Sequence, residues 1–194
     1  YPFFAHIPGW RVGMPTTPRD AKGLMKTALR SDDPVLYLEH KLLFNIKGEV
    51  PEIDADEAIP FGLASIRRQG SDITVVAMTI MVQRTLDAAA VLENEGISVE
   101  VIDPRSVAPL DIDTILESVH KTGRLLVVDE DFAPCGIGAE IAAQVMERAF
   151  DDLDAPVRRL NGLHSPVPYS PALEAAVTPN RNQTIEAIKA LIAE

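Results

Sequence analysis

Apolar runs and helical stripes alternate through the last two thirds of the chain, and this alternation limits the fold more than any other feature. The runs typical of buried strands lie at 73–78, 99–102, 125–128 and 157–160. Apolar residues at helical spacing lie at 82–90, 112–119, 141–149 and 185–192. Strands separated by helices of about ten to fifteen residues are typical of βαβ units. The pattern therefore predicts an α/β domain with a mainly parallel sheet that helices cover on both faces.

The first third of the chain contains the start and stop signals of one helix. Residues 16–20 supply a hydroxyl cap, a proline for the first helical position and an acid for the first turn. Apolar residues recur at helical spacing until 31–34 end the helix, and 35–38 is typical of a buried strand. Between Lys41 and Gly70 the pattern is lost among prolines and acids, which predicts an interdomain linker.

Composition argues against several classes of protein. The 194 residues include 18 Lys and Arg against 29 Asp and Glu, a net charge of −11, so we expect no nucleic-acid partner. One cysteine forms no internal disulfide and indicates a reducing compartment. No apolar run approaches the roughly 20 residues that cross a bilayer, so we expect a soluble protein with no membrane partner. The chain starts at Tyr1, without methionine, and we expect its natural start further upstream.

Two short motifs follow the predicted strand at 125–128. Asp129-Glu130-Asp131 falls at its carboxyl end, the edge where α/β sheets bind ligands, and predicts a functional or interface edge. Gly136-Ile137-Gly138 opens the next predicted helix, where backbone N–H groups suit a phosphate. Ile141, however, stands where a dinucleotide fingerprint has its third glycine. A structural tight turn is therefore the favoured interpretation, with phosphate binding as the alternative.

Histidine and cysteine supply no catalytic or metal-binding pattern. The four histidines are His6, His40, His120 and His164. None has a second histidine at the spacing of a metal-binding motif. His120 falls near a predicted helix C-terminus, where the helix dipole favours a partly positive imidazole. Cys135 precedes a predicted helix N-terminus, a setting that activates some thiols, but we expect it to be a small buried hydrophobe.

A longer set of motifs runs through the whole chain. It includes Phe3-Phe4-Ala5-His6-Ile7-Pro8-Gly9, Met14-Pro15-Thr16-Thr17-Pro18, Asp20-Ala21-Lys22-Gly23-Leu24, Leu38-Glu39-His40-Lys41, Asp103-Pro104-Arg105, Gly136-Ile137-Gly138-Ala139-Glu140-Ile141, Leu153-Asp154-Ala155-Pro156 and Pro166-Val167-Pro168-Tyr169. These motifs and their order resemble those of the β subunits of thiamine-diphosphate-dependent 2-oxo acid dehydrogenases. The segments 39–43 and 127–131 look most like the pyruvate and acetoin dehydrogenase branches.

The resemblance implies a fold and a division into domains. Residues 68–194 would form a three-layer α/β domain like the transketolase C-terminal domain, with a mainly parallel sheet. Residues 1–55 would form the C-terminal part of a pyrimidine-binding α/β domain and the start of a linker. Residues 56–67 would complete that linker.

The resemblance also implies an activity. Such β subunits join E1 α subunits and a second β subunit in an α2β2 heterotetramer, an oxidoreductase within a multienzyme complex. It decarboxylates a 2-oxo acid, or cleaves acetoin, on thiamine diphosphate and passes the acyl group to the lipoyl arm of an E2 acyltransferase. The enzyme would lie in the cytoplasm of a bacterium or the mitochondrial matrix of a eukaryote.

The resemblance assigns no catalytic or cofactor-binding residue to this chain. In the family, the diphosphate and Mg²⁺ bind mostly to the α subunit. The activating glutamate and catalytic histidine belong to a part of β before Tyr1, and His6 matches a later histidine. We therefore expect the fragment alone to be inactive. Two alternatives stay open: a non-catalytic domain that docks E2, or a transketolase or deoxyxylulose-phosphate synthase, whose sugar-phosphate sites need basic side chains.

A potassium site is the one metal site that we expect. The helix ending near Leu29 leaves carbonyl oxygens at the negative end of its dipole, and Asp33 adds a carboxylate. The resemblance places a K⁺ here, on the backbone oxygens of Ala28 and Leu29 and on Ser31 and Asp33, with Ser31 standing where an Asp is common. The alternative is an ordinary helix end closed by water and by local N–H bonds to Asp33.

A partner site is expected at Asp154. Glu147, Asp151, Asp152 and Asp154 crowd the C-terminal end of a predicted helix, where the dipole disfavours acids. The resemblance places Asp154 on the surface that receives the basic subunit-binding domain of E2. The alternative is a solvated acidic face.

Overall fold

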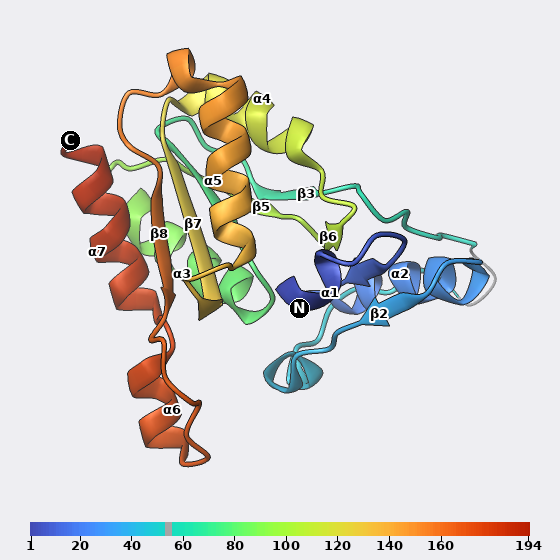
Figure 1. Cartoon of the computed structure of the whole chain (residues 1–194). Helices are drawn as coiled ribbons and strands as arrows, with labels where there is room; N and C mark the ends of the chain where they lie inside the picture. The colour runs from blue at the N-terminus through green and yellow to red at the C-terminus, as the bar shows by residue number, and fades with distance from the viewer. Residues whose placement is uncertain (53–55) are drawn as a thin grey trace.

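The computed structural model describes residues 1–52 and 56–194, and Figure 1 shows a small N-terminal group of elements beside a larger C-terminal group. The N-terminal group comprises α1 (Pro2–Ala5), β1 (Arg11–Gly13), α2 (Pro18–Arg30), β2 (Val35–Tyr37) and the 3-10 helix η1 (Lys41–Asn45). The C-terminal group comprises β3 (Ser65–Arg68), β4 (Ile73–Ala77), α3 (Ile80–Glu93), β5 (Val99–Asp103), β6 (Ser106–Ala108), α4 (Ile112–Thr122), β7 (Leu125–Phe132), α5 (Ile137–Arg148), η2 (Phe150–Asp152), β8 (Arg158–Gly162), α6 (Pro171–Val177) and α7 (Arg181–Ile192).

The C-terminal group is built on a five-stranded sheet in the order β3-β5-β4-β7-β8. All its pairs are parallel except β3 with β5, which is antiparallel. A second sheet has the order β2-β1-β6, in which β6 crosses over to pair with the N-terminal strand β1. The predicted α/β class with a mainly parallel sheet is confirmed.

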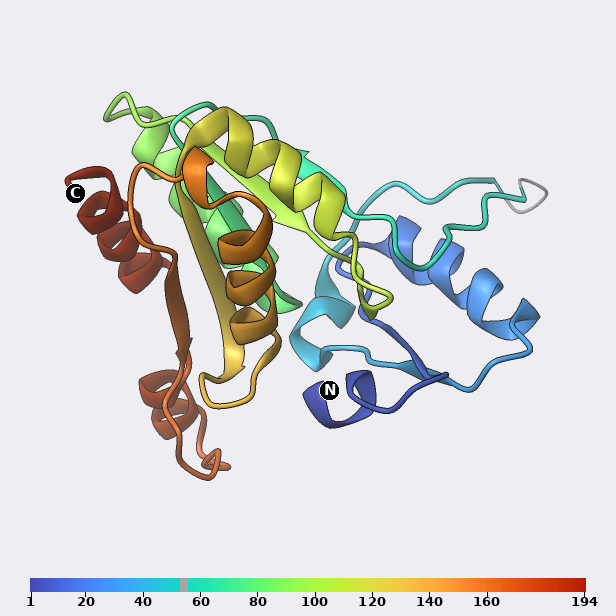
Figure 2. The ribbon, with the colours of Figure 1, turned by 45° about the horizontal axis from the view of Figure 1, so that its top comes forward.

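Helices cover both faces of the large sheet, and strand β4 shows why. Its residues Ile73, Val75 and Ala77 belong to one hydrophobic cluster with α3 and α7. Val76 belongs to the other cluster, with Ile115 of α4 and α5 residues. Successive side chains of a strand point to opposite faces, so an uninterrupted apolar run feeds both clusters. Figure 2 shows α4 and α5 on one side of the sheet and α7 on the other.

The predicted helix signals act as expected. The Thr17 Oγ1 accepts the N–H of Asp20 at 3.1 Å and caps α2. Asp111 caps α4 by accepting the N–H of Thr114 at 3.2 Å, and Gly123 ends that helix in the left-handed region, with φ 67°. No helix in the described segments is both long enough and apolar enough to cross a membrane.

Several elements differ from the sequence-based boundaries. Strand β7 continues to Phe132, so the acidic motif 129–131 lies within the strand and not after it. Strand β3 begins at Ser65, inside the segment predicted as linker. Residue 55, the end predicted for the first segment, lies outside the described residues. β6 and α6 were not predicted because a three-residue strand and a helix without buried residues leave no periodic apolar pattern.

Candidate functional site

The residues predicted for potassium lie together at the C-terminal end of α2. The N–H of Ser31 donates to the carbonyl oxygen of Ala28 at 3.2 Å, and the N–H of Asp33 donates to Ser31 Oγ at 3.2 Å. Arg11, which the sequence did not point to, donates from Nε to Asp33 Oδ2 at 2.8 Å and forms an ion pair with it. Both guanidinium contacts are to Oδ2. The carbonyl end of α2 and Asp33 Oδ1 supply hard oxygen ligands, whereas Arg11 competes with a cation for the carboxylate charge.

Asp154 lies just after η2, and its side chain is 65% exposed. Its carboxylate is 3.5 Å from Arg124 Nη1, and its N–H donates to the carbonyl oxygen of Gly123 at 2.8 Å. The neighbouring Asp152 accepts from His120 Nδ1 at 2.9 Å. Two of the four clustered acids therefore have local cationic or histidine partners, which offset the unfavourable helix dipole.

An apolar groove of about 570 Å³ lies beside Asp154. Met146 of α5 and Phe150 of η2 line it and are 44% and 63% exposed. Exposed large apolar side chains next to an unpaired or weakly paired charge are typical of an interaction surface.

The acidic end of β7 joins the two groups of elements. The Tyr1 hydroxyl donates to Asp129, whose side chain is buried. Glu130 accepts from Thr79 Oγ1 at 3.0 Å and contacts His40 Nε2 at 3.1 Å. Burial, together with the charges of Asp131 and Glu130, raises the pKa of Asp129 to about 6. The edge predicted from 129–131 is therefore an interface within the chain.

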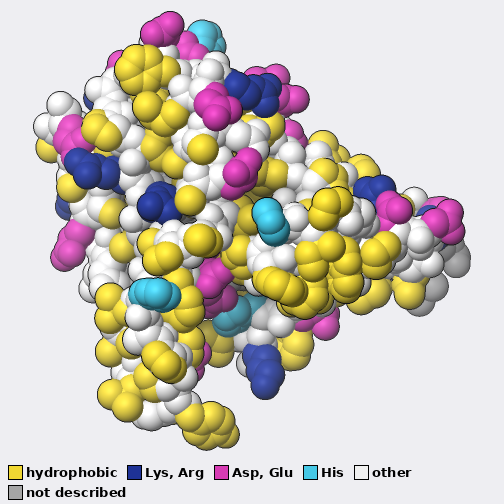
Figure 3. Space-filling model, in the orientation of Figure 1, with side chains coloured by type: hydrophobic (Ala, Val, Ile, Leu, Met, Phe, Trp, Pro, Cys, Tyr) yellow, Lys and Arg dark blue, Asp and Glu magenta, His cyan; other side chains and the backbone are white. Residues whose placement is uncertain are grey.

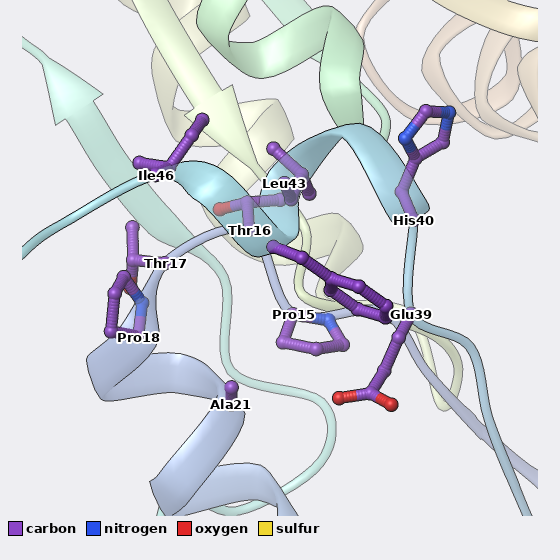
Figure 4. A pocket seen from close by; sticks show the side chains of 10 residues that line it. Pro15, Thr16, Thr17, Pro18, Ala21, Glu39, His40, Leu43 and Ile46 are labelled. Carbon is purple, nitrogen blue, oxygen red and sulfur yellow. The ribbon is translucent and has the colours of Figure 1, made fainter.

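A groove of about 310 Å³ lies between the start of α2 and η1; we name it the α2–η1 groove. It is lined by Pro15, Thr16, Thr17, Pro18, Ala21, Glu39, His40, Leu43, Phe44 and Ile46. Figure 4 shows η1 on one side, the first turn of α2 on the other, and the His40 ring turned away from the groove. His40 Nδ1 accepts the N–H of Leu42 at 3.2 Å and so caps η1.

A buried ion-pair cluster fixes the start of α2 to the C-terminal sheet. Asp20 and Asp103 are 0% and 1% exposed, and Arg67 of β3 contacts both. Arg67 Nη2 lies 2.7 Å from Asp103 Oδ2, and Arg105 Nε lies 3.0 Å from Asp20 Oδ1. Thr16 Oγ1 also donates to Asp103. Sequence reasoning missed this cluster because Asp20, Arg67 and Asp103 are separated by dozens of residues and belong to different elements.

The electrostatics of this cluster follow from burial. Burial raises the pKa of Asp103, although Arg67 and hydrogen bonds oppose the change. Burial lowers the pKa of Arg105, whereas the charges of Asp103 and Asp20 outweigh burial and raise the pKa of Arg67. The cluster contains two acids and two guanidinium groups, which is the balance that buried charges require.

Cys135 corrects an expectation: it is exposed and not buried. It lies in the turn between β7 and α5, with φ 57°, and belongs to neither of the two hydrophobic clusters. Gly136 is the N-cap of α5, so the Gly136-Ile137-Gly138 motif opens this helix as predicted. Within the described segments, no three His, Cys, Asp or Glu side chains are grouped so that they could hold a metal ion.

Comparison with known proteins places this architecture. The model of the transketolase C-terminal domain matches residues 62–184. The chain belongs to the transketolase C-terminal domain family. The model of the transketolase pyrimidine-binding domain matches residues 1–47, so the transketolase-like chain carries parts of two domain types.

Relatives with two kinds of name match nearly the whole chain. The acetoin:2,6-dichlorophenolindophenol oxidoreductase subunit beta of Cupriavidus necator is 48% identical over 97% of this chain and 55% of its own length. The pyruvate dehydrogenase E1 component subunit beta of Rickettsia felis is 47% identical over 96% of this chain and 56% of its own length. The chain thus spans little more than half the length of these relatives.

A solved structure supports the fold. A split-gene transketolase, described as an inactive β4 tetramer, superposes with a TM-score of 0.79 at 24% identity and covers 99% of this chain and 60% of its own. At that identity, the likeness concerns the transketolase-like fold alone.

Proposed function

We propose that the chain works as part of the β subunit of a thiamine-diphosphate-dependent E1 enzyme of the pyruvate or acetoin dehydrogenase type. The observation that carries this is the 47–48% identity to β subunits with both names, over the pyrimidine-binding segment and the C-terminal domain together. In this proposal the chain joins E1 α subunits and a second β subunit, and thiamine diphosphate and Mg²⁺ bind mostly outside it.

Exposed apolar surface supports assembly. Figure 3 shows hydrophobic side chains gathered over the N-terminal group and over the segment 163–180, which carries α6 and which we name the α6 arm. The exposed ones include Phe3 at 72% and, on the α6 arm, Tyr169 at 103% and Leu173 at 58%. Apolar patches of this kind mark protein interaction sites.

The test is reconstitution. The β subunit that contains this chain, purified with its α partner, should reduce a dye acceptor with pyruvate or acetoin when thiamine diphosphate and Mg²⁺ are present. The 194-residue chain alone should show no such activity. If the αβ assembly oxidises neither substrate, the E1 proposal is wrong; if the chain alone decarboxylates pyruvate, its proposed inactivity is wrong.

We also propose a K⁺ site at the end of α2, on the backbone oxygens of Ala28 and Leu29 and on Ser31 and Asp33. Its support is the carbonyl end of the helix and the second oxygen of Asp33, Oδ1, whereas both Arg11 contacts are to Oδ2. KCl should raise the midpoint of thermal unfolding above that in equimolar NaCl, and Asp33→Asn should abolish the difference. The control is Asp32→Asn, a neighbouring exposed acid. If the difference in unfolding midpoint between KCl and NaCl is the same for the parent and both variants, the site is excluded.

We propose finally that Asp154 receives the subunit-binding domain of E2. The support is its exposure, its weak 3.5 Å contact with Arg124 and the adjoining apolar groove. Removing one partner of a desolvated charge pair typically weakens binding by on the order of 2–5 kcal/mol. In titrations of the assembled E1, Asp154→Ala should therefore lose affinity and salt dependence, whereas Asp151→Ala, an exposed acid of η2, should not. Unchanged affinity in both variants would reduce Asp154 to surface charge.

A further inference from the structure

The ring of His40 holds two elements at once. Its Nε2 lies 3.1 Å from Glu130 Oε2 of β7, and its Nδ1 accepts the N–H of Leu42 in η1 at 3.2 Å. Both side chains are mostly buried, with 20% of His40 and 25% of Glu130 exposed. The ring therefore links the C-terminal sheet to one wall of the α2–η1 groove.

These two contacts require one protonation state. Nδ1 accepts a hydrogen bond through its lone pair, so the proton of the neutral ring lies on Nε2 and is donated to Glu130. A second proton would have to bind Nδ1, where it would face the N–H of Leu42, donor against donor. The protonated ring can therefore keep Glu130 but not Leu42.

We propose that His40 is a proton-operated switch for the η1 wall of the α2–η1 groove. When neutral, the ring caps η1 and contacts Glu130; when protonated, it strengthens its contact with Glu130 and releases Leu42. Acidification then loosens η1 and the groove wall that it forms.

Few other contacts hold η1 when the cap is lost. None of its residues is buried, and Leu42 and Phe44 are 57% and 65% exposed. The backbone bonds at its two ends are local, from the N–H of Leu43 to the carbonyl oxygen of His40 and from the N–H of Ile46 to that of Leu43. Leu43 packs in part against the core, which keeps η1 near the body of the protein while its first turn frays.

Most of the charged groups around the ring are acids. Glu130 lies between Asp129 and Asp131 at the end of β7, and Thr79 at the start of α3 holds Glu130 in place from the other side. On the segment of His40 itself, Glu39 and Lys41 have opposite charges. Tyr1 of the N-terminal group adds a neutral donor to Asp129. The acids thus outnumber the cations, and histidine is the side chain whose charge changes between about pH 5 and 8.

Amide hydrogen exchange of the purified chain tests the switch. After correction for intrinsic exchange, the Leu42 amide should be about fivefold less protected near pH 5 than near pH 8, as expected for the loss of a hydrogen bond. His40→Asn keeps an acceptor for the Leu42 N–H that does not titrate, so its Leu42 protection should not depend on pH in this range. Glu130→Gln should move the transition to lower pH, because the protonated ring loses its counter-charge.

A matched control is His120→Asn. His120 also contacts a carboxylate, Asp152, at 2.9 Å, but it lies on α4 away from η1. This variant should leave the Leu42 profile unchanged. The proposal is overturned if Leu42 protection does not fall on acidification, or if His40→Asn keeps the parental pH response. If His40→Asn does not fold, the ¹⁵N shifts of the His40 ring decide: a proton on Nδ1 near pH 8 would overturn the proposal, and a bare Nδ1 that gains a proton together with the loss of Leu42 protection would support it.

Discussion

Replacing Arg67 with methionine should destabilise the protein more than the loss of any surface ion pair. Arg67 contacts two carboxylates, Asp20 and Asp103, that are 0% and 1% exposed. Methionine keeps much of the volume of the arginine stem but removes the charge. Arg105 stays beside Asp20, whereas Asp103 keeps hydrogen bonds from Thr16 and from the Arg105 backbone but no direct cation.

The magnitude follows from the burial. Removing one partner of a buried ion pair destabilises by about 3–5 kcal/mol, because it leaves an uncompensated buried charge. For a chain of this size, each kcal/mol shifts the melting temperature by roughly 2–4 °C, so the expected fall is on the order of 6–20 °C.

The loss should also depend on pH. Burial already raises the pKa of Asp103, and without Arg67 the pKa should rise further. An acid with a raised folded-state pKa makes folding less favourable as pH rises from its ordinary value to the raised one. Arg67→Met should therefore lose less stability near pH 5 than near pH 8, and adding Asp103→Asn should restore part of the loss.

Urea unfolding, followed by the fluorescence of the single tryptophan Trp10 and by circular dichroism, measures the effect. The control is Arg68→Met, on the same strand, where the partner Glu93 is 67% exposed and the pair should contribute at most about 1 kcal/mol. A loss below about 1 kcal/mol for Arg67→Met, equal to that of the control at both pH values, would refute the reasoning.

Three further predictions follow from single positions. Because the pKa of Asp129 is raised from 3.8 to about 6, the free energy of unfolding should fall by about 3 kcal/mol as the pH rises from 3.8 to 6. Urea titrations across this pH range should show that Asp129→Asn removes the fall. Gly70→Ala would drive a Cβ into the backbone of β5 and should lower the melting temperature far more than Gly96→Ala, whose Cβ meets no atom within 4 Å, although its φ is 81°. Ile188→Ala should destabilise by about 2–5 kcal/mol in urea, because the side chain is fully buried in the cluster beneath α7.

The sequence predicted the elements that carry strong periodic patterns. The strand 73–78 and the helix capped at Asp111 were found because apolar spacing and cap residues agree there. Strand β3 was missed because it has only four residues and these show no alternation of apolar and polar side chains. Its last two residues, Arg67 and Arg68, both form ion pairs. Local patterns of this kind contain no information on which distant charges meet.

The candidate sites show the same division. The C-terminal end of α2 could be located from sequence because helix ends have local signals. The acidic motif 129–131 could be assigned to the carboxyl-end edge of the sheet, although β7 itself continues through it to Phe132. Their partners could not: Arg11 reaches Asp33 across the β1–β2 pair, and His40 reaches Glu130 across 90 residues. These contacts depend on how the two groups of elements pack, which no spacing within one element specifies.

The junction between the two groups combines an apolar and a polar contribution with different roles. Val12 and Met14 of the N-terminal group share a buried cluster with Val107 and Ile137 of the C-terminal group. Apolar burial holds surfaces together without fixing their orientation, because it has no direction. The ion pairs of Arg67 and the contact of His40 with Glu130 require particular atoms to meet, so they select one orientation. Weakening the polar contacts should therefore first change the relative placement of the two groups and the pH dependence of that placement. The two groups should separate only after a greater loss of contacts.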